Sequence, residues 1–196
     1  MEQHVQLEKI KKYVYELFAN DPTGHDFFHM KRVARLAKEI AIQENANEFI
    51  CEAAAWLHDV GDPKLFTNKN KAREELVTFL QSIGLTSEQI EEIGKAMEDV
   101  SFTKGNIPVT LEGKIVQDAD RIDAIGAIGI ARTFAYGGAN GQLIYHDNEP
   151  DNTSVQHFYD KLFKLKDLIN TSSAKQIAEE RQHILVEYVN QFMNEW

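Results

Sequence analysis

Helical periodicity runs through almost the whole 196-residue chain and constrains its fold more than any other feature. Apolar residues recur at the three-to-four-residue spacing of a helix face, and no convincing run alternates apolar and polar residues as a half-buried strand does. Proline, which interrupts helices, occurs only four times. We therefore predict an all-α helical bundle, with helices over residues 3–19, 26–45, 47–60, 69–83, 87–100, 111–134, 155–170 and 173–195.

Length and composition limit the class of protein. A chain of this length with 43% hydrophobic residues fits one packed domain over residues 1–196. The single cysteine, Cys51, cannot form an internal disulfide, which suits a reducing cytosol. The polar N-terminus lacks a signal-peptide pattern, and no apolar run approaches the ~20 residues of a membrane span. A net charge of −10 argues against non-specific binding to nucleic acid. We expect a cytoplasmic protein, monomeric or homodimeric, without nucleic-acid or membrane partners.

The stretch AAAWLHDVGD, residues 53–62, places two adjacent polar side chains at the end of an apolar helix. The pair His-Asp occurs three times, but residues 25–26 begin a helix and residues 146–147 lie in a polar loop, so burial is expected only for His58 and Asp59. A buried carboxylate is costly unless it is paired or bound to a metal. The stretch alone therefore leaves two interpretations open, a hydrogen-bonded His–Asp pair and a set of metal ligands.

Two other helices favour the metal. His29 continues the apolar stripe of its own helix by one turn, so it should face the same core. The predicted helix 111–134 is apolar on nearly all sides, yet Asp120 and Asp123 share a face of it that runs on to Ala127. Two imidazoles and two carboxylates suit Mn²⁺, Fe²⁺ or a neighbouring ion such as Co²⁺, Ni²⁺ or Zn²⁺. They suit Mg²⁺ less, because Mg²⁺ prefers oxygen ligands.

The combination of motifs resembles the HD-domain superfamily of metal-dependent phosphohydrolases. The matching segments are HMKRV at 29–33, HD at 58–59 and ADR at 119–121, in the order and separation of that family. The resemblance extends over nearly the whole chain. Within the superfamily, the sequence is similar to a bacterial single-domain subgroup. It implies an all-helical fold and a mononuclear metal site with four ligands: His29, His58, Asp59 and Asp120. The choice of Asp120 over Asp118 comes from the resemblance, since the periodicity favours it only weakly.

The resemblance also implies an activity, the metal-dependent cleavage of a phosphate ester or anhydride. Some similar proteins split nucleoside triphosphates into monophosphate and pyrophosphate. Others in the wider family act on deoxynucleoside monophosphates, cyclic nucleotides or guanosine alarmones. A divalent transition metal would lower the pKa of bound water and polarise a phosphoryl oxygen. We expect a nucleotide substrate, cleavage of (deoxy)nucleoside triphosphates to monophosphate and pyrophosphate, and manganese as the metal.

Two further acids are candidates for proton transfer. Asp62 lies three residues after Asp59, where many HD enzymes carry an acid, although an ordinary helix-end carboxylate would look the same. Asp123 lies one turn after Asp120, and its alternative role is a salt bridge to Arg121 or Arg132.

Cations must hold the phosphates in an acidic protein. Lys64 follows the His-Asp loop directly, and Arg32 lies one turn from His29. Arg181 lies among the apolar residues 177, 184 and 188 of the last helix, so it should point inward toward an anion, either a carboxylate or a substrate phosphate.

The region around residue 150 supplies the remaining substrate-binding candidates. Residues 135–154 read as a long loop, which is either a binding loop or a surface excursion. Tyr136 in this loop could stack on a base. Lys161 and Lys166 follow it, and only the family resemblance distinguishes them from solvated lysines.

Other functions remain open at this stage. An HD-type nucleotidase or phosphodiesterase on mono- or cyclic nucleotides would use the same ligands, and a regulatory HD protein would bind nucleotide without turnover. An HD oxygenase with two metals would need more histidines, for which His25, His157 and His183 are available. A helical adaptor would show no metal dependence.

Overall fold

The structure is a computed structural model that describes residues 2–19, 24–63, 65–100 and 105–196. Within these ranges it is helical and contains no strand, which confirms the all-α prediction. The chain forms two compact units, residues 1–119 and 120–196, and helix α6 runs from the first into the second. The expectation of a single domain stays a prediction. No helix of the described part is both long and apolar enough to cross a lipid bilayer.

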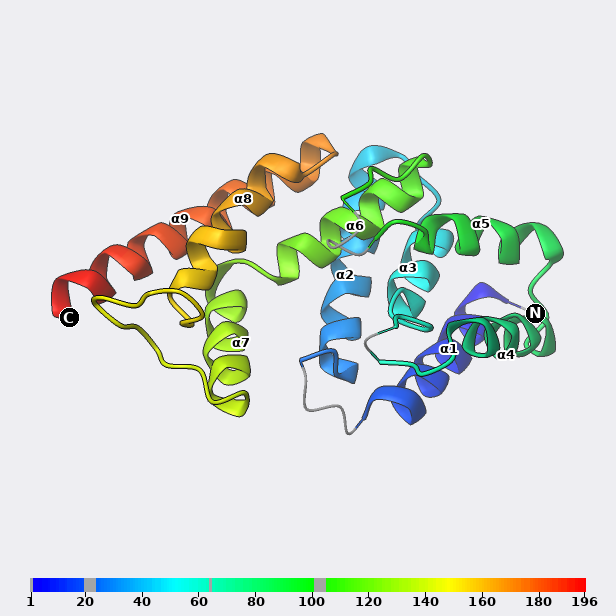
Figure 1. The fold of residues 1–196 in the computed structure, drawn as a ribbon. Helices are drawn as coiled ribbons and strands as arrows, with labels where there is room; N and C mark the ends of the chain where they lie inside the picture. The colour runs from blue at the N-terminus through cyan, green and yellow to red at the C-terminus, as the bar shows by residue number, and fades with distance from the viewer. Residues whose placement is uncertain (1, 20–23, 64, 101–104) are drawn as a thin grey trace. The chain divides into compact units, whose positions relative to one another are not determined.

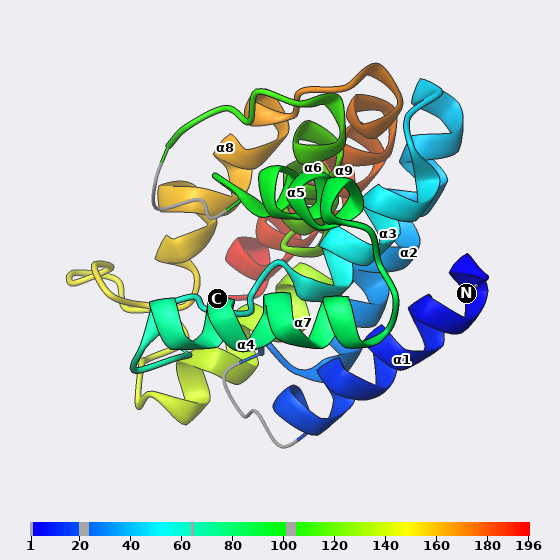
Figure 2. The same cartoon turned by 90° about the vertical axis from the view of Figure 1, so that its right-hand side faces the viewer.

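The first unit is built around α3 (Figure 1). Its helices are α1 (Gln3–Phe18), α2 (Phe27–Glu44), α3 (Glu48–Leu57), α4 (Lys69–Ser82) and α5 (Ser87–Met97), followed by the first part of α6 (Leu111–Asp123). Helices α1, α2 and α5 all pack on α3, and α4 packs on α5 (Figure 2). Residues 49–57 of α3 are all buried. Because α3 forms the centre of the unit, the residues at its end are held by surrounding helices.

Side-chain caps explain where these helices start. Asp26, Asn47 and Asn68 each accept a hydrogen bond from a backbone amide of the first turn, at the starts of α2, α3 and α4. Thr86 forms a reciprocal capping box with Gln89 at the start of α5. Asn45 then ends α2 in the left-handed conformation, with φ of 55°. The predicted starts of these four helices agree with the structure to within one residue.

The second unit pairs α7 (Gly126–Ala139) with α9 (Ser172–Glu195). Between them lie a π-helix η2 (Phe158–Leu162), a short α8 (Phe163–Leu165) and a 3₁₀ turn η3 (Lys166–Leu168). Phe134, Phe158 and Tyr188 form an aromatic cluster, with ring centroids 5.9 to 6.0 Å apart. These contacts bring residues from α7, η2 and α9 into one core.

Three predicted boundaries are wrong in this unit. The predicted helix 111–134 ends at Asp123, and α7 begins at Gly126, whose φ of 76° interrupts the helix. Ala127 therefore does not continue the face of Asp120 and Asp123. Helix α7 extends to residue 139, so the loop predicted over 135–154 begins at residue 140 (Figure 1). The helix predicted over 155–170 consists of the π, α and 3₁₀ segments between residues 158 and 168.

A candidate metal centre

The start of α2 brings two imidazoles together. Asp26 caps the helix by accepting a hydrogen bond from the His29 amide at 2.7 Å. His29 lies in the first turn and is fully buried, as its place on the apolar stripe predicts. His25 lies just before the cap, and its ring meets that of His29 edge to face, with centroids 5.6 Å apart. The cap therefore fixes the backbone that carries both rings.

The end of α3 supplies a third imidazole and a carboxylate. The His58 Nδ1 donates a hydrogen bond to the Ala55 carbonyl at 2.8 Å. Because a carbonyl oxygen only accepts, this bond places the proton on Nδ1 and leaves the Nε2 lone pair available for a ligand. Nε2 faces Asp59, whose Oδ1 lies 3.4 Å away. The His58 ring also meets the His29 ring, at a centroid distance of 5.4 Å.

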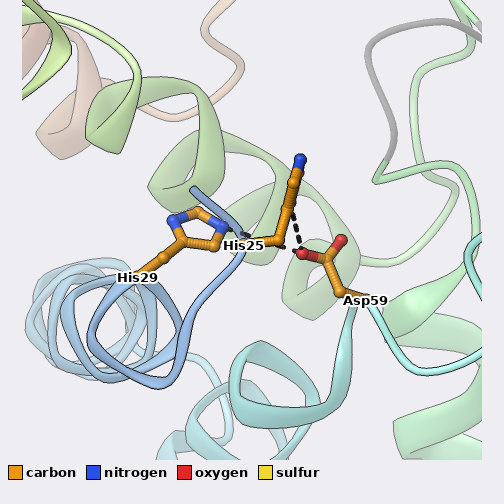
Figure 3. A group of neighbouring side chains, drawn as sticks. All are labelled: His25, His29 and Asp59. Carbon is orange, nitrogen blue, oxygen red and sulfur yellow. Dashed lines mark hydrogen bonds and ion pairs between the residues drawn. The ribbon is translucent and has the colours of Figure 1, made fainter. Parts of the chain in front are cut away.

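We call His25, His29, His58 and Asp59 the His–Asp cluster. The Asp59 Oδ2 lies 2.8 Å from His25 Nδ1 and 3.8 Å from His29 Nε2 (Figure 3). One ligand atom from each of His25, His29 and Asp59 lies within 4.8 Å of the other two. From the sequence, His29 and the His58-Asp59 pair were expected to face the same core, and the structure places these three side chains close together.

The imidazoles govern the charge of Asp59. Burial alone would raise the pKa of this carboxyl group. The electrostatic influence of the neighbouring His58, the hydrogen bond from His25 and the influence of His25 and His29 act in the opposite direction and outweigh burial. The pKa of Asp59 is consequently held well below its ordinary value, so the group is a carboxylate near neutral pH. A carboxylate beside imidazole nitrogens is a mixed oxygen and nitrogen donor set, which fits a divalent transition ion better than Mg²⁺.

The predicted fourth ligand, Asp120, lies in the last turn of α6 and belongs to the second unit. Asp120 is half-buried, whereas its neighbours Asp118 and Asp123 are fully buried. Arg121 braces this turn of α6 by donating a hydrogen bond to the Leu168 carbonyl.

The two candidate acids have different surroundings. Asp62 is half-buried and follows Asp59 in a tight turn, in which its amide donates to the Asp59 carbonyl at 3.0 Å. Gly61 allows this turn because its φ is 84°. Asp123 forms an ion pair with Arg132 at 2.8 Å, which is one of the alternatives that the sequence left open. The structure thus gives Asp123 a structural partner and leaves a catalytic role for Asp62 as a prediction.

The predicted phosphate-binding residues are spread over both units. Arg32 lies on α2, one turn from His29, and is half-buried. Lys64 lies outside the described residues. Lys161 is half-buried in the π-helix η2, Lys166 pairs with Glu179 at 3.1 Å, and Tyr136 is exposed on α7.

The buried face of α9 differs from the prediction. Ala178, Leu185 and Val189 are buried, whereas Ile184, which was expected on the apolar face, is 41% exposed. The face is therefore displaced by one residue. Arg181 is nevertheless half-buried, and its guanidinium donates a hydrogen bond to the Ile122 carbonyl at 2.6 Å. This acceptor is a backbone oxygen, whereas either a carboxylate or a substrate phosphate was expected from the sequence.

His25 is the residue of the cluster that the four-ligand prediction omits. The sequence places it before a helix cap, and a residue outside the helix has no periodicity from which its direction could be inferred. A signal was present in its spacing, because His25 and His29 flank the cap Asp26 in one short segment.

Known proteins of similar sequence and structure identify the family of this chain. The model of the HD domain family matches residues 26–125, a range that contains His29, His58 and Asp59. The chain is 38% identical over 195 residues to the protein YpgQ of Bacillus subtilis (strain 168). The alignment covers 97% of this chain and 94% of YpgQ.

Solved structures match this chain over its full length. The crystal structure of Bacillus subtilis YpgQ in complex with ADP matches with a TM-score of 0.87 and 37% identity, over 100% of this chain and 97% of that one. An HD-superfamily hydrolase from Bacillus thuringiensis matches with a TM-score of 0.84 and 41% identity, over 100% and 98% of the two chains. These likenesses, together with the family model that matches residues 26–125, show that the chain belongs to the HD domain family.

Proposed function

We propose that this protein is a metal-dependent phosphohydrolase that cleaves (deoxy)nucleoside triphosphates to monophosphate and pyrophosphate. The observation that carries the proposal is the convergence of His29, His58 and Asp59 within an HD domain. Buried imidazoles around an ionised carboxylate are arranged to hold a cation. The ADP complex of YpgQ supports a nucleotide as the ligand.

The proposed metal ligands are His29, His58, Asp59 and Asp120, with manganese as the ion. The fourth ligand rests on the family resemblance. Asp120 is half-buried, so its carboxylate is less enclosed than that of Asp118.

A divalent ion at this site would polarise a phosphoryl oxygen and make water more acidic. The chain's own groups would then position the substrate and accept protons. Asp62 is the proposed proton acceptor, because it follows the ligand Asp59 in a tight turn and is partly accessible. Asp123 is the weaker candidate, because Arg132 already pairs with it.

Pyrophosphate is released when water attacks the α-phosphorus, so the β- and γ-phosphates must extend toward cations. The proposed cations are Arg32, Lys64, Lys161, Lys166 and Arg181. Tyr136 is the proposed residue that stacks on the base, because this residue is 52% exposed on α7. We further propose a cytoplasmic protein that acts as a monomer or homodimer on free nucleotides.

Phosphorus NMR of the products tests this function directly. The purified protein is incubated with Mn²⁺ and each member of a panel of nucleoside and deoxynucleoside triphosphates, diphosphates and monophosphates. Hydrolysis in oxygen-18 water should place the label in the nucleoside monophosphate and leave pyrophosphate unlabelled. Orthophosphate with a nucleoside would instead indicate a nucleotidase, and orthophosphate with a nucleoside diphosphate would indicate attack at the γ-phosphorus.

The ADP complex of YpgQ also favours a second candidate, a nucleotide-binding HD protein that does not turn its ligand over. Such a protein would bind ADP or ATP in a calorimetric titration, with and without Mn²⁺, and would release no product with any member of the panel.

A further inference from the structure

His25 lies outside the proposed set of four metal ligands and directly contacts one of them. Its Nδ1 lies 2.8 Å from Oδ2 of Asp59. Figure 3 marks this contact with a dashed line between the two side chains. The cap formed by Asp26 holds the backbone on either side of it, because this cap binds the amide of His29. The His25 ring is therefore placed by the start of α2, while Asp59 comes from the end of α3.

The contact assigns different roles to the two oxygens of Asp59. A carboxylate oxygen only accepts hydrogen bonds, so Nδ1 of His25 is the donor. Oδ2 receives this bond, while Oδ1 faces Nε2 of His58 at 3.4 Å. A donor on one oxygen restrains rotation of the whole carboxylate group. It therefore also sets the direction in which the other oxygen points.

We propose that His25 is a positioning residue that orients the Asp59 carboxylate for metal binding. This inference rests on the metal centre of the proposed function. Groups that hydrogen-bond to metal ligands fix the ligand geometry, and their loss commonly weakens metal affinity by about 10–100-fold. His25 suits this task because one third of its side chain is exposed, so a substitution there removes the hydrogen bond without opening the core.

If His25 were itself a metal ligand, its substitution would have a different effect. The donor atoms of His25, His29 and Asp59 lie close enough together to surround an ion of their own. In that case His25 would be a ligand of a second ion, and removing its ring would change how many ions bind. As a positioning residue, it changes the affinity and leaves the number of ions unchanged.

Three substitutions of one residue separate these roles. His25→Ala removes both ring nitrogens. His25→Asn places an amide nitrogen close to the position of Nδ1, and His25→Gln places one close to the position of Nε2. His183→Ala is the matched control, because His183 is a histidine on α9 whose side chain is 73% exposed. Each variant is titrated calorimetrically with Mn²⁺, its cobalt(II) absorption spectrum is recorded, and the melting temperature of its metal-free form is measured.

We expect His25→Ala to bind Mn²⁺ about 10–100-fold more weakly than wild type, with the same number of ions per chain. His25→Asn should restore most of the affinity and the wild-type cobalt spectrum, and His25→Gln should not. His183→Ala should match wild type throughout.

Several results would overturn the inference. Unchanged affinity in His25→Ala would do so while leaving the proposed function intact. Loss of one ion per chain, or rescue by His25→Gln alone, would make His25 a ligand instead. A wild-type protein that takes up no Mn²⁺ would overturn the metal centre and this inference together.

Discussion

Asp120 and Asp118 lie two residues apart on α6, and a single substitution in each tests the fourth metal ligand. Asp120→Asn removes a charged ligand, so Mn²⁺ affinity should fall by more than the ~10–100-fold typical of residues that only support a ligand. Asp118→Asn should leave the affinity near the wild-type value. Calorimetric titration with Mn²⁺ measures both, and the reverse order would show that the family resemblance selects the wrong aspartate.

The ion pair between Asp123 and Arg132 leads to a second prediction at the residue scale. Asp123 is fully buried, so Asp123→Asn leaves the charge of Arg132 with a weaker partner inside the second unit. Breaking a buried pair by removing one partner costs about 3–5 kcal/mol, and partial exposure of Arg132 places this case near ~3 kcal/mol. Urea unfolding measures the loss. A variant that keeps its stability and loses activity would instead make Asp123 catalytic.

Burial of His29 was predictable because it follows from the helical periodicity of α2, and burial of Asp59 was expected because this residue comes at the end of an apolar helix. The contact between His25 and Asp59 was not, since it joins a residue before α2 to one after α3 and depends on how these helices cross. The partner of Arg181 was equally hidden, because a backbone carbonyl carries no residue type that a sequence pattern could reveal.

The break between α6 and α7 is the feature at the scale of elements that the sequence analysis missed. Gly126 has a φ of 76°, and a Cβ atom on it would lie 3.0 Å from Cγ of Arg181. Gly126→Ala should therefore lower the free energy of unfolding by about 2 kcal/mol, from left-handed strain of roughly 1–2 kcal/mol and crowding of that side chain. Thermal and urea unfolding of the second unit measure the change.

Gly138 on α7 is the matched control for this substitution. A Cβ atom there meets nothing within 4 Å, and the residue is helical. Gly138→Ala should raise the free energy of unfolding by about 0.5–1 kcal/mol, because alanine favours a helix more than glycine does. If Gly126→Ala raises the free energy of unfolding as Gly138→Ala is expected to do, the break at Gly126 does not require a left-handed glycine.

The start of a helix was easier to predict than its interruption. The starts of α2 to α5 follow capping side chains, which are visible in the sequence as Asp26, Asn47, Asn68 and Thr86. The break at Gly126 occurs in an apolar segment with several glycines, where nothing in the local pattern distinguishes the one that turns. The π-helix at Phe158–Leu162 is similarly invisible, because its residues have the apolar spacing of an ordinary helix.

At the scale of the whole molecule, the family match and the all-helical fold could both be anticipated from motif order and periodicity. The division into two compact units could not, because α6 runs through the boundary without a linker. The net charge of −10 reflects 31 acidic residues against 21 lysines and arginines, so the chain as a whole repels an anionic ligand. The proposed binding of a triphosphate would therefore depend on a small set of placed basic residues, of which Arg32, Lys161 and Arg181 are half-buried.

Labelling of the Cys51 thiol can measure local unfolding of α3 in the first unit. Cys51 is the only cysteine of the chain and is fully buried in this helix. Burial, with a smaller effect from Glu112, raises the pKa of its thiol to about 12. At pH 8 only about one folded molecule in 10,000 would carry the reactive thiolate, so a disulfide reagent should react only after α3 opens. Opening also displaces His58 and Asp59, which follow directly at the end of this helix.

Bound metal should therefore slow the labelling of Cys51. With Mn²⁺ at 100 times its dissociation constant, the open population falls about 100-fold, equivalent to ~2.7 kcal/mol. The rate of thiol modification at pH 8 is followed with and without Mn²⁺, and a chelator should restore the faster rate. Asp59→Ala provides the control, because its rate should not respond to Mn²⁺. A wild-type rate that is independent of Mn²⁺ would mean that α3 opens without disturbing the metal ligands, or that these residues hold no metal.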